Sequence, residues 1–161
     1  MTVTFRKTTM EDRPYLISWL DDPDILKWFP MTNRAEIEDS VNFWMHHMAI
    51  GACLTACIDE KPCGFANLYI PSLKRLAHQC LLAIIVDPFK RGQGIGSSLM
   101  DEIAHLAKVS FKIEILHLEV YENNPAISLY QRKGFIKYGE HPRFIKIENQ
   151  YMSKILLQKR I

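Results

Sequence analysis

The alternation of apolar and polar residues over 3–7 predicts a short strand that is buried on one face. The apolar period then becomes helical. Thr9 is a suitable N-cap for a first helix, which the DDPD segment at 21–24 interrupts, and Asn33 is a suitable N-cap for a second. The chain is therefore expected to begin with one strand and two amphipathic helices. The residues expected on the buried stripes of these helices are Tyr15, Leu16, Trp19 and Leu20, and then Ile37, Val41, Trp44, Met45 and Met48.

The pattern changes to strands after Gly51. Segments 54–59 and 64–70 are strand-like, with a turn between them. Residues 81–86 are apolar without alternation, which is typical of a central strand covered on both faces, and Asp87 and the proline after it end this strand. The remaining predicted elements are a helix from 95 to 107, a strand over 113–120, a short helix over 126–132, and two final strands near 135–138 and 151–157.

The order of these elements is β-α-α-β-β-β-α-β-α-β-β. Three early antiparallel strands precede a strand–helix–strand crossover, and this combination predicts an α/β fold with a mixed sheet. The length of 161 residues suits one domain with a single core, so we expect one domain over 1–161.

The composition adds few constraints. Hydrophobic residues make up 48% of the chain and charged residues 24%, with a formal net charge of +2, so no nucleic-acid or anionic-membrane partner is indicated. The longest apolar run is too short to span a bilayer, and the first residues lack the pattern of a signal peptide. We therefore expect a cytoplasmic protein, either a monomer or a homodimer. Its four cysteines form no C-x-x-C pair and have no histidine at ligand spacing, which favours reduced thiols and no metal site.

The sequence RGQGIGSS, residues 91–98, lies between the buried strand and the next helix. Backbone N–H groups and the helix dipole can hold an anion at such a junction. The dinucleotide pattern G-x-G-x-x-G fails because its third glycine is replaced by Ser97 or Leu99, depending on where the pattern starts. A Walker A loop fails because no lysine stands at the required position. Two interpretations of 91–98 remain. It is either a glycine-rich turn that binds no ligand or a third kind of phosphate-binding loop.

The remaining pattern is R-x-x-G-x-G, formed by Arg91, Gly94 and Gly96. It resembles the pyrophosphate-binding loop of the GCN5-related N-acetyltransferases (GNAT), which bind acetyl-CoA. Residues 118–135, LEVYENNPAISLYQRKGF, are similar to the family's strand, asparagine turn and tyrosine helix, in the family's order. The resemblance extends over about 3–157. It implies a GNAT fold, in which a central mixed and mostly antiparallel sheet with a splayed central strand is flanked by about four helices.

The resemblance also implies an acetyl-CoA site. Backbone amides of the glycine loop would bind the pyrophosphate beside the positive charge of Arg91, and the end of the central strand would pair with the pantetheine amides. Asn123 either contacts the cofactor or only shapes the turn before Pro125. The residues expected to bind the cofactor are Ile84, Ile85, Val86, Arg91, Gly92, Gln93, Gly94, Ile95, Gly96, Ser97 and Asn123.

Two residues match catalytic positions of the family. Tyr130 matches the tyrosine that protonates the departing thiolate, although an aromatic residue here could also simply pack on the sheet. Glu119 corresponds to the base proposed in the ribosomal-alanine subgroup, and a purely structural role is the alternative. His78 is a weaker candidate, and a water relay to backbone carbonyls is a further possibility.

The resemblance implies transfer of an acetyl group to a primary amine by direct attack, and a non-catalytic CoA-binding module is the competing hypothesis. Trp28 and Phe29 could form an apolar wall of the acceptor pocket or pack in the core. Leu81 and Asn67 stand where polyamine-acetylating and other relatives have carboxylates. A protein N-terminus or an amino sugar is therefore favoured over a polyamine as the acceptor.

Overall fold

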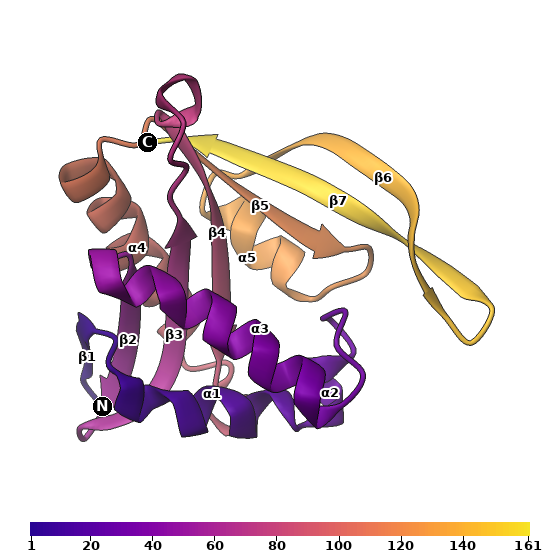
Figure 1. The fold of residues 1–161 in the computed structure, drawn as a ribbon, viewed down its shortest axis with the longest axis horizontal. Coiled ribbons are helices and arrows are strands. Elements are labelled where there is room, and N and C mark those ends of the chain that lie inside the picture. Colours follow the sequence, from indigo (N-terminus) through magenta and orange to yellow (C-terminus); the bar gives the residue numbers. More distant parts are fainter.

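A seven-stranded sheet runs through the molecule in the computed structural model, which describes residues 1–161 (Figure 1). The strand order is β1-β2-β3-β4-β5-β7-β6. Only β4 and β5 run parallel, so the expected mixed and mostly antiparallel sheet is confirmed. The strands are β1 Val3–Lys7, β2 Cys53–Ile58, β3 Lys61–Tyr69, β4 Gln79–Val86, β5 Ile115–Tyr121, β6 Ile136–Ile147 and β7 Gln150–Arg160.

The sheet forks at its parallel pair. Strands β4 and β5 pair only from Gln79 opposite Ile115 to Leu81 opposite His117. Beyond Leu81, β4 continues to Val86 with β3 as its only neighbour. The splayed central strand is therefore confirmed, and it leaves backbone N–H and C=O groups of β4 unpaired on the side toward β5.

Five α-helices flank the sheet, one more than the sequence predicts. The additional helix is α2, which begins at Pro23 in the DDPD segment that was expected only to end the preceding helix. Asp22 caps it by accepting a hydrogen bond from the backbone N–H of Asp24, and proline suits a first helical position. The helices are α1 Arg13–Leu20, α2 Pro23–Leu26, α3 Arg34–His46, α4 Ile95–Phe111 and α5 Ala126–Arg132.

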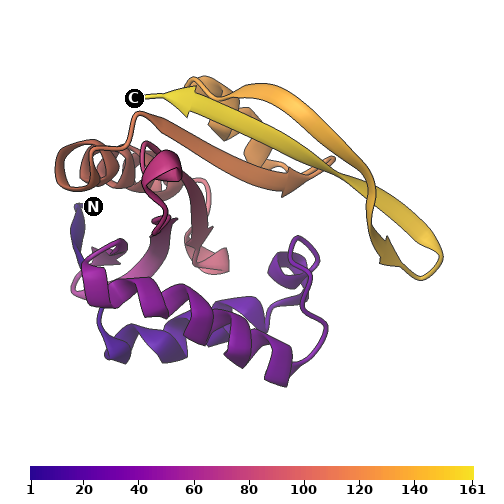
Figure 2. The ribbon, with the colours of Figure 1, turned by 45° about the horizontal axis from the view of Figure 1, so that its top comes forward.

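The helices form a layer on each face of the sheet (Figures 1 and 2). Helices α1 and α3 bury Phe65 and Ile85, which mark the α1/α3 face. Helices α4 and α5 bury Ala66 and Leu118, which mark the α4/α5 face. Because side chains alternate along a strand, Glu119 on β5 points to the α1/α3 face.

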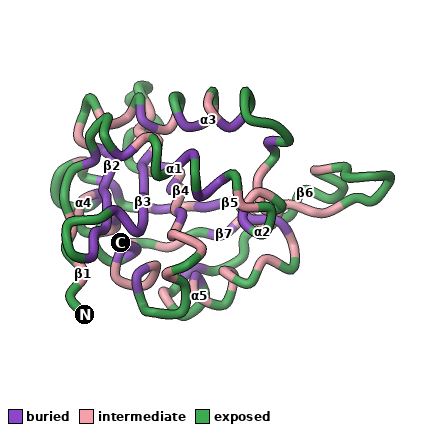
Figure 3. Tube along the Cα trace, turned by 90° about the horizontal axis from the view of Figure 1, so that it is seen from below, coloured by how far each residue is buried: buried purple, intermediate pink, exposed green.

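The observed burial of residues in α1 and β4 differs in part from the burial that the sequence pattern predicts. The stripe of α1 is formed by Leu16, Ile17, Trp19 and Leu20, whereas Tyr15 is 41% exposed and its predicted burial is wrong. Strand β4 is not covered on both faces throughout, since Leu81 and other residues on it are only half-buried beside the fork. Figure 3 shows the buried residues in the central strands and on the inner sides of α1 and α3.

The last two strands are longer than the sequence predicts. They form a hairpin that extends past the end of β5, because β7 pairs with β5 only from Lys154 onward (Figure 2). Its turn at Glu148 and Asn149 has two left-handed residues, which matches the twist of antiparallel strands.

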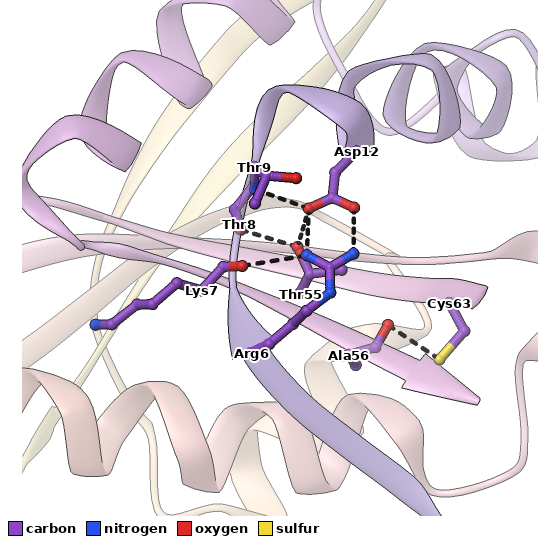
Figure 4. A network of polar contacts seen from close by, with 8 residues as sticks. All are labelled: Arg6, Lys7, Thr8, Thr9, Asp12, Thr55, Ala56 and Cys63. Carbon is purple, nitrogen blue, oxygen red and sulfur yellow. Dashed lines mark hydrogen bonds and ion pairs between the residues drawn. The ribbon is translucent and has the colours of Figure 1, made fainter. Parts of the chain in front are cut away.

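A polar network ties β1 and the start of the first helical segment to β2 (Figure 4). The two guanidinium NH2 groups of Arg6 donate to the two carboxylate oxygens of Asp12 at 2.7 and 2.8 Å. The carboxylate also accepts from the backbone N–H of Thr9 and from the hydroxyl of Thr55, each at 2.9 Å. Burial alone would raise the pKa of Asp12, but these hydrogen bonds and the charge of Arg6 outweigh it and hold the pKa below its usual range.

We expect Asp12→Asn to lower the free energy of unfolding by about 2 kcal/mol at pH 7, since it removes a 3% exposed carboxylate that accepts several hydrogen bonds. A depressed pKa stabilises the fold above the unfolded value of about 3.9, and this contribution is lost as the pH falls through the folded value. The difference between wild type and variant in urea unfolding should thus shrink below about pH 4. Asp39→Asn, at an exposed carboxylate, is the control. Equal stability of the two variants at pH 7 would contradict the prediction.

Candidate active site

A cleft of about 540 Å³ occupies the fork between β4 and β5. Six consecutive residues of β4, 81–86, line it, and consecutive strand residues point to opposite faces. The cleft is therefore accessible from both faces of the sheet. The other lining residues are Trp28, Phe29, Trp44, Tyr69, Lys90, Arg91, Gly92, Gly94, Ile95, Gly96, Ser97, Leu118, Glu119, Val120, Asn124, Pro125, Ala126, Leu129, Tyr130 and Arg132.

The glycine loop forms one end of the cleft, at the N-terminus of α4. Gly92 and Gly94 have φ of +73° and +80°, and a Cβ at either position would meet no protein atom within 4 Å. The first α-helical bond runs from Ser98 N–H to the Gly94 carbonyl, so the N–H groups of the three residues before Ser98 have no intrahelical acceptor. These donors and the helix dipole suit a pyrophosphate.

All the cationic residues that line the cleft lie near this loop or on α5, namely Lys90, Arg91 and Arg132. Their positive charge suits the same anion. Gln93 belongs to the loop but does not line the cleft. The unpaired edge of β4 over 84–86 precedes the loop by a few residues, lines the same cleft and could pair with a ligand carrying amide groups.

Tyr130 lies on α5 and is only 7% exposed. Its ring packs edge-to-face on Phe135 with centroids 6.2 Å apart, and it reaches the cleft from the α4/α5 face. Burial raises the pKa of Tyr130 to about 12, although Arg91 acts in the opposite direction. The phenol therefore stays protonated at neutral pH, as a proton donor must.

The two asparagines before α5 differ in position. Asn124 lines the cleft, and its side-chain oxygen accepts a hydrogen bond from the N–H of Ala126 at 2.9 Å. Asn123 is exposed, has a left-handed φ of 65° and does not line the cleft. The sequence left open whether Asn123 contacts the ligand or only shapes the turn, and it is Asn124 that the structure brings to the cleft. Nothing in the sequence distinguishes the two, because either can adopt a left-handed turn conformation.

Glu119 is the only carboxylate that lines the cleft, and it lies on the α1/α3 face. Its Oε2 accepts a hydrogen bond from Lys154 Nζ at 2.9 Å, and this ammonium also lies 3.9 Å from the ring centroid of Phe144. Glu119 and Tyr130 thus reach the same cleft from opposite faces of the sheet.

None of the other positions that the sequence analysis considered for the general base places a carboxylate in the cleft. Leu81 lines the cleft with an apolar side chain. Asn67 is fully buried beside Tyr69, and neither atom of its carboxamide makes a hydrogen bond. His78 is exposed and does not line the cleft.

Trp44 and Tyr69 are cleft residues that sequence reasoning missed. Trp44 had been assigned to the buried stripe of α3, but it is half-buried and faces the cleft. Tyr69 is the last residue of β3, and its ring contacts Phe43 and His47 at the C-terminal end of α3. Only the position of the fork shows that both residues border an opening.

No three His, Cys, Asp or Glu side chains lie close enough together to hold a metal ion. No helix has the length and apolar character needed to cross a membrane.

A sheet that splays at its parallel pair beside a helix N-terminus with free N–H groups belongs to an α/β protein able to bind a phosphate-bearing ligand. Residues 11–135 match the acetyltransferase (GNAT) family, and the chain belongs to this family. Acetyl-CoA is the cofactor of the family. The anion-binding loop and the unpaired edge of β4 fit its pyrophosphate and its amide-containing arm.

Comparisons with individual proteins extend the family assignment. The chain is 27% identical over 100 residues to the L-amino acid N-acetyltransferase AaaT of Escherichia coli K12, covering 62% of each chain. It is 40% identical over 74 residues to an N-alpha-acetyltransferase of Sulfolobus acidocaldarius, covering 45% of this chain and 43% of that one. The matches thus span less than two thirds of these relatives. The fold resembles that of yncA from Salmonella typhimurium, solved with acetyl-CoA, with a TM-score of 0.82, 15% identity and coverage of 99% and 94%.

Proposed function

We propose that the protein is an acetyl-CoA-dependent N-acetyltransferase that acts on a primary amine by direct attack in a ternary complex. The observation that carries the proposal is the arrangement of Glu119 and Tyr130 on opposite faces of one fork. The base would thus face the incoming amine, and the acid would face the departing sulfur. A protein N-terminus or an amino sugar is the proposed acceptor.

In the proposed reaction, Glu119 and Tyr130 each transfer one proton. Glu119 accepts a proton from the acceptor ammonium, directly or through water, which frees the nitrogen lone pair. Bound acetyl-CoA supplies the thioester whose carbonyl carbon the nitrogen attacks. As the new C–N bond forms and the C–S bond breaks, Tyr130 donates its phenolic proton to the sulfur, and the amide nitrogen loses its remaining excess proton to solvent.

Direct attack is favoured over a covalent enzyme intermediate because no cysteine lines the cleft. All four cysteines are buried and free. Burial raises the pKa of Cys53 and Cys80 to about 12, so these thiols are poor nucleophiles at neutral pH.

The charges that line the cleft and the names of two relatives restrict the class of amine that we propose as the acceptor. One lining carboxylate, already paired with Lys154, offers no second anion for the other ammonium groups of a polyamine. The names of the two curated relatives concern an L-amino acid in one case and an α-nitrogen in the other. Both observations support an α-amine, and we therefore rank a protein N-terminus before an amino sugar.

The test is a thiol-release assay with acetyl-CoA and four amine classes: short peptides with free N-termini, the same peptides with blocked N-termini, glucosamine, and spermidine. We expect release with free peptides and a mass increase of one acetyl group on the peptide. Blocked peptides are the matched control. Acetyl-CoA binding in calorimetry without turnover on any amine would contradict the proposal and favour a non-catalytic CoA-binding module, for which the apolar Leu81 in the cleft is the main support.

A further inference from the structure

Four aromatic side chains line the α1/α3 side of the cleft. Trp28 and Phe29 follow α2, Trp44 lies on α3, and Tyr69 ends β3. The rings of Phe29 and Trp44 are in tilted contact, with centroids 5.7 Å apart. These four residues, which come from three separate parts of the chain, are called the aromatic wall.

The aromatic wall is not simply part of the core. Trp19, in the same helical layer, is 5% exposed, whereas all four residues of the wall are only half-buried and border the cleft. Large aromatic surface that remains accessible inside a cleft is typical of a binding pocket, because a ligand can remove it from water. Packing among these residues alone leaves that surface uncovered.

Few charged groups line the cleft beside the wall. The Lys27 ammonium lies 5.5 Å from the ring centroid of Trp28, but Lys27 does not line the cleft and is paired with Asp24 at 3.5 Å. The cationic lining residues, Lys90, Arg91 and Arg132, belong to the glycine-loop end and α5. On the wall's side the cleft has Glu119 as its single ionic group, and the neighbouring Lys154 is already paired with it. The site therefore offers a partner for one amine and no free cation for a carboxylate.

Tyr69 connects the wall to this carboxylate. Tyr69 on β3 lies opposite Leu81 on β4, and Leu81 lies opposite His117 on β5, two residues before Glu119, so Tyr69 and Glu119 are on the same face of the sheet. Burial raises the pKa of Tyr69 to about 12. The phenol remains a hydrogen-bond donor at neutral pH. An acceptor amine beside Glu119 would consequently have its adjacent side chain against the aromatic wall.

We infer that the acceptor is a polypeptide N-terminus whose first residue has a large apolar side chain. The wall would hold that side chain, Glu119 would face the amine, and the carboxyl group would be in amide linkage because the site has no cation for it. This inference rests on the proposed function and adds the selectivity of its acceptor site.

The experiment measures kcat/KM for peptides that differ only in their first residue: Phe, Leu, Ser or Gly. We expect the Phe and Leu peptides to exceed the Gly peptide by roughly 30-fold, as burial of one large apolar side chain allows. Phenylalaninamide should likewise exceed free phenylalanine by roughly 10-fold, because the free carboxylate would be buried without a counter-charge.

Trp44→Ala should reduce the Phe/Gly ratio to less than about 5 while leaving the Kd for acetyl-CoA unchanged, since it shortens the wall on the acceptor side only. Trp28→Ala gives a second variant in case Trp44→Ala does not fold. Tyr15→Ala, an exposed aromatic of the same layer outside the cleft, is the matched control and should keep the wild-type ratio.

The outcomes separate this inference from the proposed function. Equal turnover of Gly, Ser and Phe peptides would overturn the inference and leave N-acetyltransfer intact. So would a preference for free phenylalanine over its amide. Loss of acetyl-CoA affinity in Trp44→Ala with an unchanged Phe/Gly ratio would assign the wall to the donor and also overturn it. Turnover with glucosamine but no peptide would overturn the inference alone. Turnover with spermidine only would overturn the inference and the proposed acceptor class, and absence of turnover on all amines would overturn both the inference and the proposed function.

Discussion

Tyr130→Phe is expected to lower kcat about 100-fold while leaving the Kd for acetyl-CoA unchanged. The variant removes one oxygen atom from a side chain that is otherwise held by its packing against Phe135. The sulfur would then leave without a positioned proton donor, and water would have to protonate it. Stopped-flow or steady-state thiol release gives kcat, and calorimetry gives the Kd.

The pH profile provides an independent check on this role. Because burial raises the pKa of Tyr130 to about 12, the phenol keeps its proton over the alkaline range in which enzymes are normally assayed. Wild-type kcat should show no decline from loss of this proton below about pH 11. A decline near pH 9 that disappears in Tyr130→Phe would show that the phenol ionises too early for the proposed role.

Two comparisons make the Tyr130 result specific. Tyr121→Phe is the matched control, because Tyr121 is also buried with its pKa raised to about 12 but does not line the cleft. It should retain kcat. Glu119→Gln removes the proton acceptor on the opposite face and should lower kcat/KM by a similar factor of about 100. Full turnover of Tyr130→Phe would refute the assignment of the proton donor.

Gly94→Trp should weaken acetyl-CoA binding at least about 100-fold, equivalent to about 3 kcal/mol. The space around Gly94 contains no protein atom within 4 Å of a built Cβ, so an added side chain would project into the region proposed for the pyrophosphate. Calorimetric titration with acetyl-CoA measures the effect, and urea unfolding shows whether the variant is folded.

The test must distinguish the effect of backbone strain on stability from steric obstruction of the bound acetyl-CoA. Gly94→Ala and Gly51→Ala both place a Cβ on a residue with strongly positive φ, +80° and +73°, and each should cost about 1 kcal/mol of stability. Only the Gly94 variant should weaken acetyl-CoA binding, because Gly51 lies outside the cleft. Wild-type affinity in Gly94→Trp would show that the ligand's phosphates lie elsewhere.

The fold was largely predictable because local patterns and long-range packing agree over most of the chain. The short helix α5 was predicted with its observed bounds, Ala126–Arg132, and Asn33 caps α3 by accepting from the N–H of Glu36 as expected. Helix α2 was missed because a four-residue helix has too few positions to show a period. The two strands of the final hairpin were predicted, but their full length was missed because the outer residues of β6 face solvent on both sides and show no alternation.

The site was predictable mainly on the α4/α5 face of the sheet, and on the opposite face the sequence indicated Glu119, Trp28 and Phe29 but not Trp44 or Tyr69. The glycine loop and Tyr130 lie in one continuous segment whose spacing is tied to its backbone geometry, so a resemblance could identify them. The opposite face is assembled from separate elements, and neither Trp44 nor Tyr69 carries a local sign of exposure. Their position depends on where β4 leaves β5, which is a property of the whole sheet.

The division of the cleft between the two faces is largely repeated along the chain, with Glu119 and the shared strand β4 as the exceptions. Every lining residue before position 70 lies on the α1/α3 side, whereas the glycine loop, Asn124 and Tyr130 lie between positions 90 and 131. We therefore expect substitutions in the first 70 residues to change the proposed acceptor site without altering the loop proposed to bind the donor. A sheet forked in this way would allow the acceptor preference to change through one segment while the other continues to bind the same thioester.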